Sequence, residues 1–123
     1  MRRGEVWTLS GGSDYTGKPR PVVLIQEDGF DATASITVCA FTTDPTDAPF
    51  TRLSVEPNER NGLRKPSRLM VDKITTVPKS KLGARIGRLD NEDLQRLNRA
   101  MLVFLGLAGA PRGRASSEKI IED

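Results

Sequence analysis

The chain has 123 residues, of which 37% are hydrophobic, 28% are charged and 5% are aromatic, and its formal net charge is +3. This length fits one domain, whose core must consist mainly of Val, Leu, Ile and Ala because aromatic residues are scarce. The single cysteine excludes an internal disulfide framework. The absence of histidine excludes histidine-containing zinc sites and the Ser-His-Asp and Cys-His catalytic systems.

The hydropathy pattern indicates a protein without a membrane segment. No apolar stretch follows the opening Met-Arg-Arg-Gly-Glu sequence, so a signal peptide is not expected. The longest nearly apolar run covers residues 101–110, whereas a membrane-spanning helix needs about 20 residues. We therefore expect a soluble, cytoplasmic protein.

The charges are distributed unevenly along the chain. Residues 52–88 contain ten basic and three acidic side chains, whereas residues 1–51 contain four basic and seven acidic ones. A concentrated basic segment attracts polyanions and strengthens binding through counterion release. Charge alone does not distinguish such a binding patch from an ordinary solvated surface.

Most of the chain has the composition of short β-strands separated by polar turns. Alternating or continuous apolar residues predict strands at 5–9, 20–26, 35–41, 51–55, 67–71 and 84–88, and residues 72–77 are expected to continue the strand at 67–71. The strand at 20–26 contains four consecutive apolar residues, which predicts burial on both faces and a central place in the sheet. Residues 10–18 and 42–48 have loop composition, and the dipeptide Asn61-Gly62 is typical of a tight turn.

A helix is predicted after the last strand. Asp90 is suited to the N-cap, acidic residues occupy the first turn, and apolar residues recur at helical spacing through Leu107. Gly106 and Gly109 mark the end. The second half of this helix is apolar nearly all round, which is consistent with a dimer contact. We therefore predict one domain at 1–109, a flexible tail at 110–123, and a mainly β fold that closes as a small barrel of five to seven short strands with a C-terminal helix.

Two strand ends carry candidate phosphate-binding groups. Arg20 opens the central strand behind a glycine-containing loop, and its guanidinium can present a planar set of donors to a phosphate. An ion pair with Asp14 or Asp44 is the alternative. Thr42 and Thr43 end the next strand, where their hydroxyls could bind a phosphate or form a turn toward Asp44-Pro45.

A third group of candidates lies in the basic segment. Ser67 and Arg68 open a predicted strand just after Arg64 and Lys65, and together these four residues could follow a nucleic-acid backbone. No carboxylates have the spacing of metal ligands, so we expect neither a divalent metal nor another cofactor. The cysteine, Cys39, fits a small buried apolar residue in a strand better than a reactive thiol.

In order along the chain, these motifs resemble the MazF/PemK family of toxins. The matching segments are Arg3-Gly4-Glu5-Val6-Trp7, the Gly-Lys-Pro-Arg-Pro sequence with the apolar strand at 17–26, Phe41-Thr42-Thr43, Pro49-Phe50, Asn61-Gly62-Leu63, Ser67, residues 73–77, Gly87-Arg88-Leu89 and the final helix. The resemblance covers residues 2 to about 108. It implies an SH3-like barrel of the PemK/CcdB kind, a homodimer, and an acidic, partly disordered antitoxin of the MazE kind that covers the basic groove.

The resemblance also implies a reaction. Family members cleave single-stranded RNA at specific sequences without a metal, as the ribose 2′-hydroxyl attacks its own phosphate to leave a 2′,3′-cyclic phosphate or 3′-phosphate and a 5′-hydroxyl. By position, Arg20 would stabilise the pentacoordinate phosphate and Thr42 would hydrogen-bond to it. The residues expected to contact RNA are Ser13, Asp14, Thr43, Arg64, Lys65, Ser67 and Arg68.

The chain departs from the family pattern at two places. Ser13-Asp14-Tyr15 stands where many relatives have Ser-Glu-Gln. Met70, followed by Asp72, stands where some plasmid-type relatives have an arginine, so that Arg20 or Arg68 would have to serve instead.

Two other functions agree with the same sequence features. A gyrase poison of the CcdB type would share the fold and cut nothing, but its Trp-Gly-Ile ending is replaced here by Ile121-Glu122-Asp123. A non-catalytic nucleic-acid-binding barrel would use the basic segment without needing Arg20 or Thr42.

Overall fold

A computed structural model describes residues 1–10 and 18–109 of the chain. Within them the strands are β1 (Glu5–Leu9), β2 (Arg20–Leu24), β3 (Ser35–Thr42), β4 (Arg52–Val55), β5 (Ser67–Met70), β6 (Thr75–Pro78) and β7 (Leu82–Arg88). The helices are α1 (Asn91–Phe104) and three 3-10 turns, η1 (Asp28–Phe30), η2 (Val71–Lys73) and η3 (Lys79–Lys81). The predicted fold, mainly β with a C-terminal helix, is confirmed.

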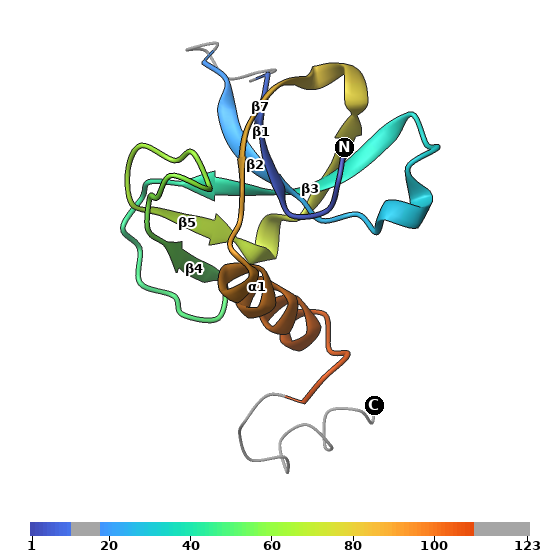
Figure 1. Ribbon diagram of the computed structural model, residues 1–123. Coiled ribbons are helices and arrows are strands. Elements are labelled where there is room, and N and C mark those ends of the chain that lie inside the picture. Colours follow the sequence, from blue (N-terminus) through green and yellow to red (C-terminus); the bar gives the residue numbers. More distant parts are fainter. Residues whose placement is uncertain (11–17, 110–123) are drawn as a thin grey trace.

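The strands form one strongly bent antiparallel sheet (Figure 1). Its order is β4-β5-β3-β2-β1-β7, and β6 pairs with β3 beside this path. Among the described residues the end strands β4 and β7 are not hydrogen-bonded to each other, so the sheet curls like a barrel but stays open. One stretch of its outer edge is covered by a loop, because Arg88 N donates to Arg60 O at 2.8 Å.

The expectation that residues 72–77 continue the strand at 67–71 is wrong, because η2 separates β5 from β6. The cause lies in β3, whose C-terminal end pairs with β5 and whose N-terminal half pairs with β6. The chain must therefore step from one part of the bent sheet to another. Val71, fully buried at this step, anchors the turn in the core.

The central strand β2 is buried on both faces, as its continuous apolar sequence predicts. Val23 packs with Cys39 and Phe41 in a cluster that also includes Leu97 of the helix. Val22 and Leu24 face the other way, into a second cluster with Val38. Full burial of each such side chain contributes roughly 1.5–3 kcal/mol, so these two clusters fix the position of β2 relative to β3.

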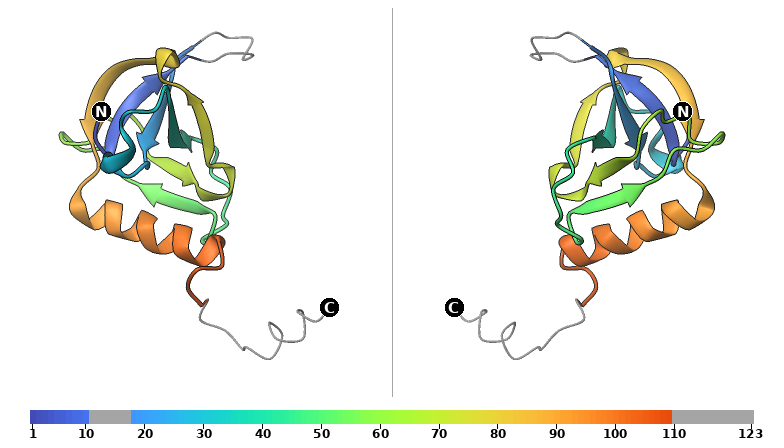
Figure 2. Two further views of the ribbon diagram at one scale, coloured as in Figure 1. Left: turned by 90° about the vertical axis from the view of Figure 1, so that its right-hand side faces the viewer. Right: turned by 90° about the vertical axis from the view of Figure 1, so that its left-hand side faces the viewer.

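Helix α1 covers the first cluster and lies next to β4 (Figure 2). It begins after Asp90, which is the N-cap residue as predicted, although the Asp90 carboxylate caps no helical amide. Instead it accepts a bond from Asn58 Nδ2 at 3.2 Å and pairs with Arg60 at 3.7 Å. The helix thus holds the loop between β4 and β5 through its first turn.

The helix ends earlier than its apolar pattern suggested, at Phe104. Gly106 has a φ of +76°, which favours glycine, and its N–H donates to Val103 O at 3.1 Å. The Leu107 N–H donates to Leu102 O at 2.8 Å. These two bonds form a Schellman motif, so Leu107 lies beyond the last helical turn rather than within it.

Candidate phosphate-binding groove

Three of the candidate residues lie near the ends of neighbouring strands. Thr42 of β3 is directly opposite Arg68 of β5, and opposite residues of an antiparallel pair share a face. The register of β2 with β3 pairs Val22 with Ala40, and Arg20 and Thr42 each lie two residues beyond this pair, toward the same end of the two strands. The sheet therefore brings Arg20, Thr42 and Arg68 to one end of three neighbouring strands.

A pocket of about 280 Å³ opens at this place. Its lining residues are Lys18, Pro19, Arg20, Pro21, Phe41, Thr42, Thr43 and Ser67. The pocket thus joins the start of β2 to the end of β3 and the start of β5. Four predicted site residues, far apart in sequence, line one concave surface.

A second pocket of about 160 Å³ adjoins the first, because Thr43 and Ser67 line both. It is also lined by Asp44, Pro45, Ser54, Glu56, Pro66 and Arg68. We refer to the two pockets together as the polar groove. A continuous concave surface of this kind suits an extended polymer better than a compact ligand.

Thr42 combines a structural bond with a donor that could serve a ligand. Its Oγ1 accepts from Asp44 N at 3.1 Å, so the predicted turn toward Asp44-Pro45 is present. The Asp44 carboxylate in turn accepts from Thr46 N at 3.1 Å and from its hydroxyl at 2.9 Å. Since the Thr42 hydroxyl acts as acceptor in this turn, its proton can still be donated toward the pocket.

The β5 residues are held by backbone carbonyls. Ser67, which is 6% exposed, donates from Oγ to Lys65 O at 2.9 Å. The Arg68 guanidinium donates to Thr46 O, which ties it to the loop that follows Thr42. Both side chains are consequently fixed before any ligand arrives.

Arg64 and Lys65 are exposed and directly precede Pro66, a lining residue of the second pocket. Neither lines the groove itself, so the structure puts them beside it rather than in it. Ser13, Asp14 and Tyr15 lie outside the described residues.

Sequence reasoning missed several lining residues. Lys18 belongs to the Gly-Lys-Pro-Arg-Pro sequence and could have been proposed from its position next to Arg20. Ser54 lies opposite Arg68 on β4, which only the register of β4 with β5 reveals. The same register puts Arg52 opposite Met70, and Arg52 is paired with Asp72.

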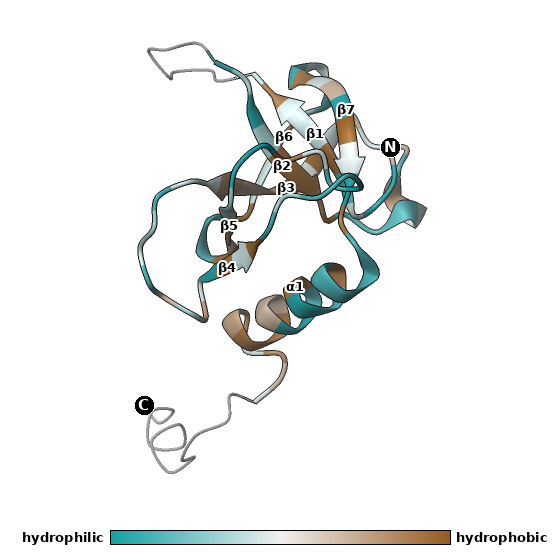
Figure 3. Cartoon of the chain, turned by 60° about the vertical axis from the view of Figure 1, so that its left-hand side comes forward, coloured by the Kyte–Doolittle hydropathy of each residue, from teal (hydrophilic) through white to brown (hydrophobic). Residues whose placement is uncertain are grey.

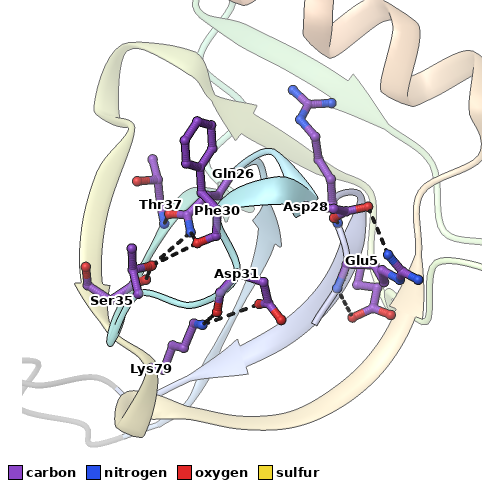
Figure 4. A network of polar contacts seen from close by, with 11 residues as sticks. Glu5, Gln26, Asp28, Phe30, Asp31, Ser35, Thr37 and Lys79 are labelled. Atoms are coloured by element: carbon purple, nitrogen blue, oxygen red, sulfur yellow. Dashed lines mark hydrogen bonds and ion pairs between the residues drawn. The ribbon is translucent and has the colours of Figure 1, made fainter.

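Several basic side chains of the segment at 52–88 are paired with acidic residues from other parts of the chain. Arg60 pairs with Asp90 at 3.7 Å, Lys79 with Asp31 at 3.3 Å and Arg85 with Glu5 at 3.2 Å. Figure 4 shows the contacts of Lys79 and Glu5 within a network that joins the N-terminal segment to residues 26–37. Several basic side chains therefore stabilise the fold, and fewer remain for a ligand.

The fold shifts the pKa values of three groups, Cys39, Asp72 and Glu5. Burial raises the pKa of Cys39 to about 12, so its thiol stays protonated and inert at neutral pH, as expected for a buried strand residue. Partial burial opposes ionisation of Asp72, but the hydrogen bond and charge of Arg52 outweigh it and lower the pKa. At Glu5, bonds from Arg2 N and the Trp7 indole together with Arg85 likewise outweigh burial and lower the pKa.

Within residues 1–10 and 18–109, no three His, Cys, Asp or Glu side chains gather where they could hold a metal ion. The expected metal independence stays a prediction.

In the same part of the chain, no helix is long and apolar enough to cross a membrane.

The fold and the groove define a small β-sheet protein whose strand ends line a polar groove. Residues 2–105 match the family of PemK-like, MazF-like toxins of type II toxin–antitoxin systems. A protein of Mycolicibacterium smegmatis described as a probable endoribonuclease MazF is 57% identical over 109 residues, which cover 89% of this chain and 100% of that protein. The chain therefore belongs to the PemK-like, MazF-like toxin family.

Solved structures of similar fold come from the same family. An endoribonuclease in complex with its cognate antitoxin, from mycobacterial species, superposes with a TM-score of 0.74 at 22% identity, covering 89% of this chain and 99% of that one. The Mycobacterium tuberculosis toxin MazF-mt6 gives a TM-score of 0.71 at 24% identity, covering 85% and 99%. At these identities the likeness shows a shared fold.

Proposed function

We propose that this chain is a sequence-specific endoribonuclease toxin that cleaves single-stranded RNA without a metal ion and is neutralised by a cognate antitoxin. The observation that carries the proposal is the convergence of Arg20, Thr42 and Ser67 on one pocket, with Arg68 opposite Thr42. The 57% identical protein, described as a probable endoribonuclease, supports the same activity. We expect the protein to act in the cytoplasm, where its substrate is found.

In the proposed reaction the RNA supplies its own nucleophile. The 2′-hydroxyl loses its proton and attacks the adjacent phosphorus, while the bond to the 5′-oxygen breaks and that oxygen gains a proton. The products are a 2′,3′-cyclic phosphate, or the 3′-phosphate formed from it, and a 5′-hydroxyl. No protein side chain becomes covalently attached, so histidine and cysteine nucleophiles are unnecessary.

The protein's part in this reaction is to position and stabilise the phosphate. Negative charge accumulates on the non-bridging oxygens of the pentacoordinate phosphorus, and fixed donors aimed at such charge are an effective source of catalysis. Arg20 provides a permanently charged fork, and Thr42 donates its hydroxyl proton. Because arginine is a poor acid, its role here is electrostatic.

The rest of the groove would hold flanking nucleotides. Arg68, Ser67 and Thr43 continue from the first pocket into the second, so a phosphodiester chain can follow them. Arg64 and Lys65 beside the groove would add salt-dependent affinity. Ser13 and Asp14, in the loop before Lys18, are proposed as further RNA contacts on the strength of the family resemblance.

A homodimer and an antitoxin complete the proposal. Large apolar side chains stay exposed near the end of α1, with Leu102 44%, Leu105 57% and Leu107 71% exposed. Leu102, Leu105 and Leu107 line a groove of about 470 Å³ that also includes Met101, and we assign this side of α1 to the dimer contact. A structure of similar fold is described as a MazE–MazF complex from Deinococcus radiodurans, which supports a MazE-like partner here.

The activity is tested by incubating a long single-stranded RNA with the purified protein in excess EDTA and mapping the new ends. We expect discrete cuts with 5′-hydroxyl ends, lost in Arg20→Ala and kept in Lys81→Ala, a matched control on exposed η3. Unaltered RNA in the presence of folded, dimeric protein would contradict the proposal. Binding to gyrase would then indicate the gyrase-poison function, and RNA binding without cleavage would indicate a plain binding protein.

The dimer contact has its own test. Leu102→Asp combined with Leu105→Asp should convert the dimer to a monomer by light scattering, whereas Lys81→Ala should not. A wild-type protein that is monomeric at micromolar concentration would contradict the assignment.

A further inference from the structure

A second groove, different in character from the polar groove, runs along the other side of α1. Arg96, Arg99, Ala100 and Val103 recur at helical spacing and face Pro49, Phe50 and Leu53, with Gly109 at one end. The enclosed volume is about 520 Å³. We call this the apolar groove, and the hydropathy colouring of the last turns of α1 in Figure 3 agrees with its composition.

The apolar groove contains exposed apolar surface next to positive charge. Phe50 is 61% exposed, which is unusual for so large an apolar side chain on a free surface. Arg96 is held by Asp93 at 2.8 Å and by Ser54 O at 3.0 Å. Arg99 is exposed and forms no ion pair with any residue at 1–10 or 18–109. The chemistry therefore suits a peptide that carries branched apolar side chains next to carboxylates.

The chain itself contains such a peptide. Residues 118–123 read Glu-Lys-Ile-Ile-Glu-Asp, with two adjacent isoleucines among three acidic residues and one basic residue. The chain continues into this segment from Gly109, at the rim of the groove.

The connecting segment is long enough to reach the groove. Ten residues lie between Gly109 and Ile120. A flexible chain of the resulting eleven Cα–Cα steps spans roughly 17–20 Å on average. The groove extends along α1 for about 10 Å between Arg96 and Val103, from the helical rise of 1.5 Å per residue.

This segment lies outside the part of the chain shared with the family. The family match ends at residue 105, and the 57% identical relative is covered completely by an alignment of 109 residues. The C-terminal residues therefore lie beyond the part of the chain that matches the family model. A role for them in this chain has to be sought outside the common toxin machinery.

We propose that residues 118–123 bind the apolar groove of their own chain, with Ile120 and Ile121 against Phe50 and Val103, and an acidic side chain paired with Arg99. Occupancy covers Phe50 and restrains the connection between β3 and β4. That connection also provides Thr43 and Asp44 to the polar groove, so the bound segment stiffens one wall of it. The proposal holds whether or not the polar groove cleaves RNA.

Disulfide trapping tests the docking directly. The native Cys39 is fully buried, so new cysteines can be introduced at Ala100 and Ile121 without interference. We expect the Ala100→Cys/Ile121→Cys protein to form an intrachain disulfide at least 10-fold faster than the control pair Ser80→Cys/Ile121→Cys, whose first site is exposed on η3. Equal rates, or a product that joins two chains, would overturn the proposal.

A second measurement avoids changing the groove. The amides of Thr51 and Arg52 donate to Ala48 O at 3.0 and 2.7 Å, next to Phe50, and their hydrogen exchange reports on this turn. Ending the chain at residue 109, or introducing Ile120→Asp and Ile121→Asp together, should speed their exchange several-fold, whereas Lys119→Ala should not. Exchange that is the same in all four proteins would overturn the proposal.

Discussion

The polar groove and the apolar groove are built from the same short piece of chain, on its two opposite faces. Ser54 of β4 lines the polar groove and its neighbour Leu53 lines the apolar one. In the preceding connection, Thr43 to Pro45 face the polar groove and Pro49 and Phe50 face the apolar groove. Because successive residues of a strand point to opposite faces, one ribbon can present hydroxyls and charge to RNA and apolar surface to protein.

The two grooves differ in how firmly their side chains are held by the rest of the protein. In the polar groove, strand register and backbone carbonyls hold Thr42, Ser67 and Arg68 before a ligand arrives. In the apolar groove, Phe50 remains largely exposed and gains most when it is covered. The first arrangement suits catalysis and the second suits docking.

The largest expected effect removes the substrate's own nucleophile. An RNA with a single 2′-deoxy nucleotide at the mapped cleavage position should not be cut there at all, while it binds with nearly unchanged affinity. This outcome is expected because the polar groove contributes positioning and charge but no attacking atom. Cleavage at the deoxy position, measured by end mapping, would require a protein or water nucleophile and would contradict the proposed chemistry.

A change in the scaffold should damage both grooves together. Asn61 is fully buried; its Oδ1 accepts from Asn58 N and Leu63 N at 3.1 and 2.9 Å, and its Nδ2 donates to Glu56 O at 2.9 Å. Asn61→Ala should lower the free energy of unfolding by about 2–4 kcal/mol, since it leaves buried partners unsatisfied. Urea unfolding measures this effect, with the exposed Asn91→Ala as the control, for which a change below about 0.5 kcal/mol is expected. Equal stability of the two variants would mean that Asn61 does not organise the loop before β5.

Two variants, one in each groove, should separate RNA binding by the polar groove from tail docking in the apolar groove. Arg68→Ala should weaken RNA binding roughly 10-fold and reduce the salt slope of log K by about one, because one phosphate contact is lost. Phe50→Asp should leave both quantities unchanged and should abolish tail docking. Binding titrations over a range of salt concentrations provide the readout. The separation fails if Phe50→Asp lowers RNA affinity as much as Arg68→Ala does.

The smallest effects concern pH. The lowered carboxyl pKa values of Glu5 and Asp72 mean that their contribution to stability is present above the ordinary carboxyl range and is lost as the pH falls through it. For Cys39 the dependence of stability on pH has the opposite sign. Its pKa is raised to about 12, so the unfolded chain releases the thiol proton first, and stability falls as the pH rises above about 9.

Urea unfolding at a series of pH values tests both effects. In a plot of the free energy of unfolding against pH, Cys39→Ala should remove the decrease at alkaline pH only. Asp72→Asn should reduce the decrease at acid pH only. If stability still decreases at alkaline pH in Cys39→Ala, another group must cause the decrease.

Much of the site could be predicted because strand ends are visible in sequence. Arg20, before a continuous apolar run, and Thr42, after an alternating one, mark positions that a curved antiparallel sheet brings together. The family resemblance indicated which of these to choose. Pairing partners were harder to foresee, since Ser54 and Arg52 become relevant only when the register of β4 with β5 is known.

The number of basic residues in a segment predicted the binding surface less well than the strand ends did. The excess of basic residues at 52–88 did not distinguish a binding patch from a solvated surface, and Arg60, Lys79 and Arg85 in fact pair with acidic residues from elsewhere in the chain. Such pairs depend on tertiary contacts between segments far apart in sequence, which composition does not contain. The early end of α1 similarly depended on the conformation of Gly106 rather than on apolar periodicity.

The central claim is that Arg20 and Thr42, which line one pocket, stabilise a phosphate as it is attacked. Single-turnover cleavage of a short mapped RNA by Arg20→Ala tests this claim most directly. Removal of one such donor costs roughly 10²–10³-fold in rate. We predict a loss of at least that size in the rate of the chemical step, with RNA affinity changed less than 10-fold and partial recovery in Arg20→Lys. A cleavage rate in Arg20→Ala within a few-fold of the wild type would contradict the account.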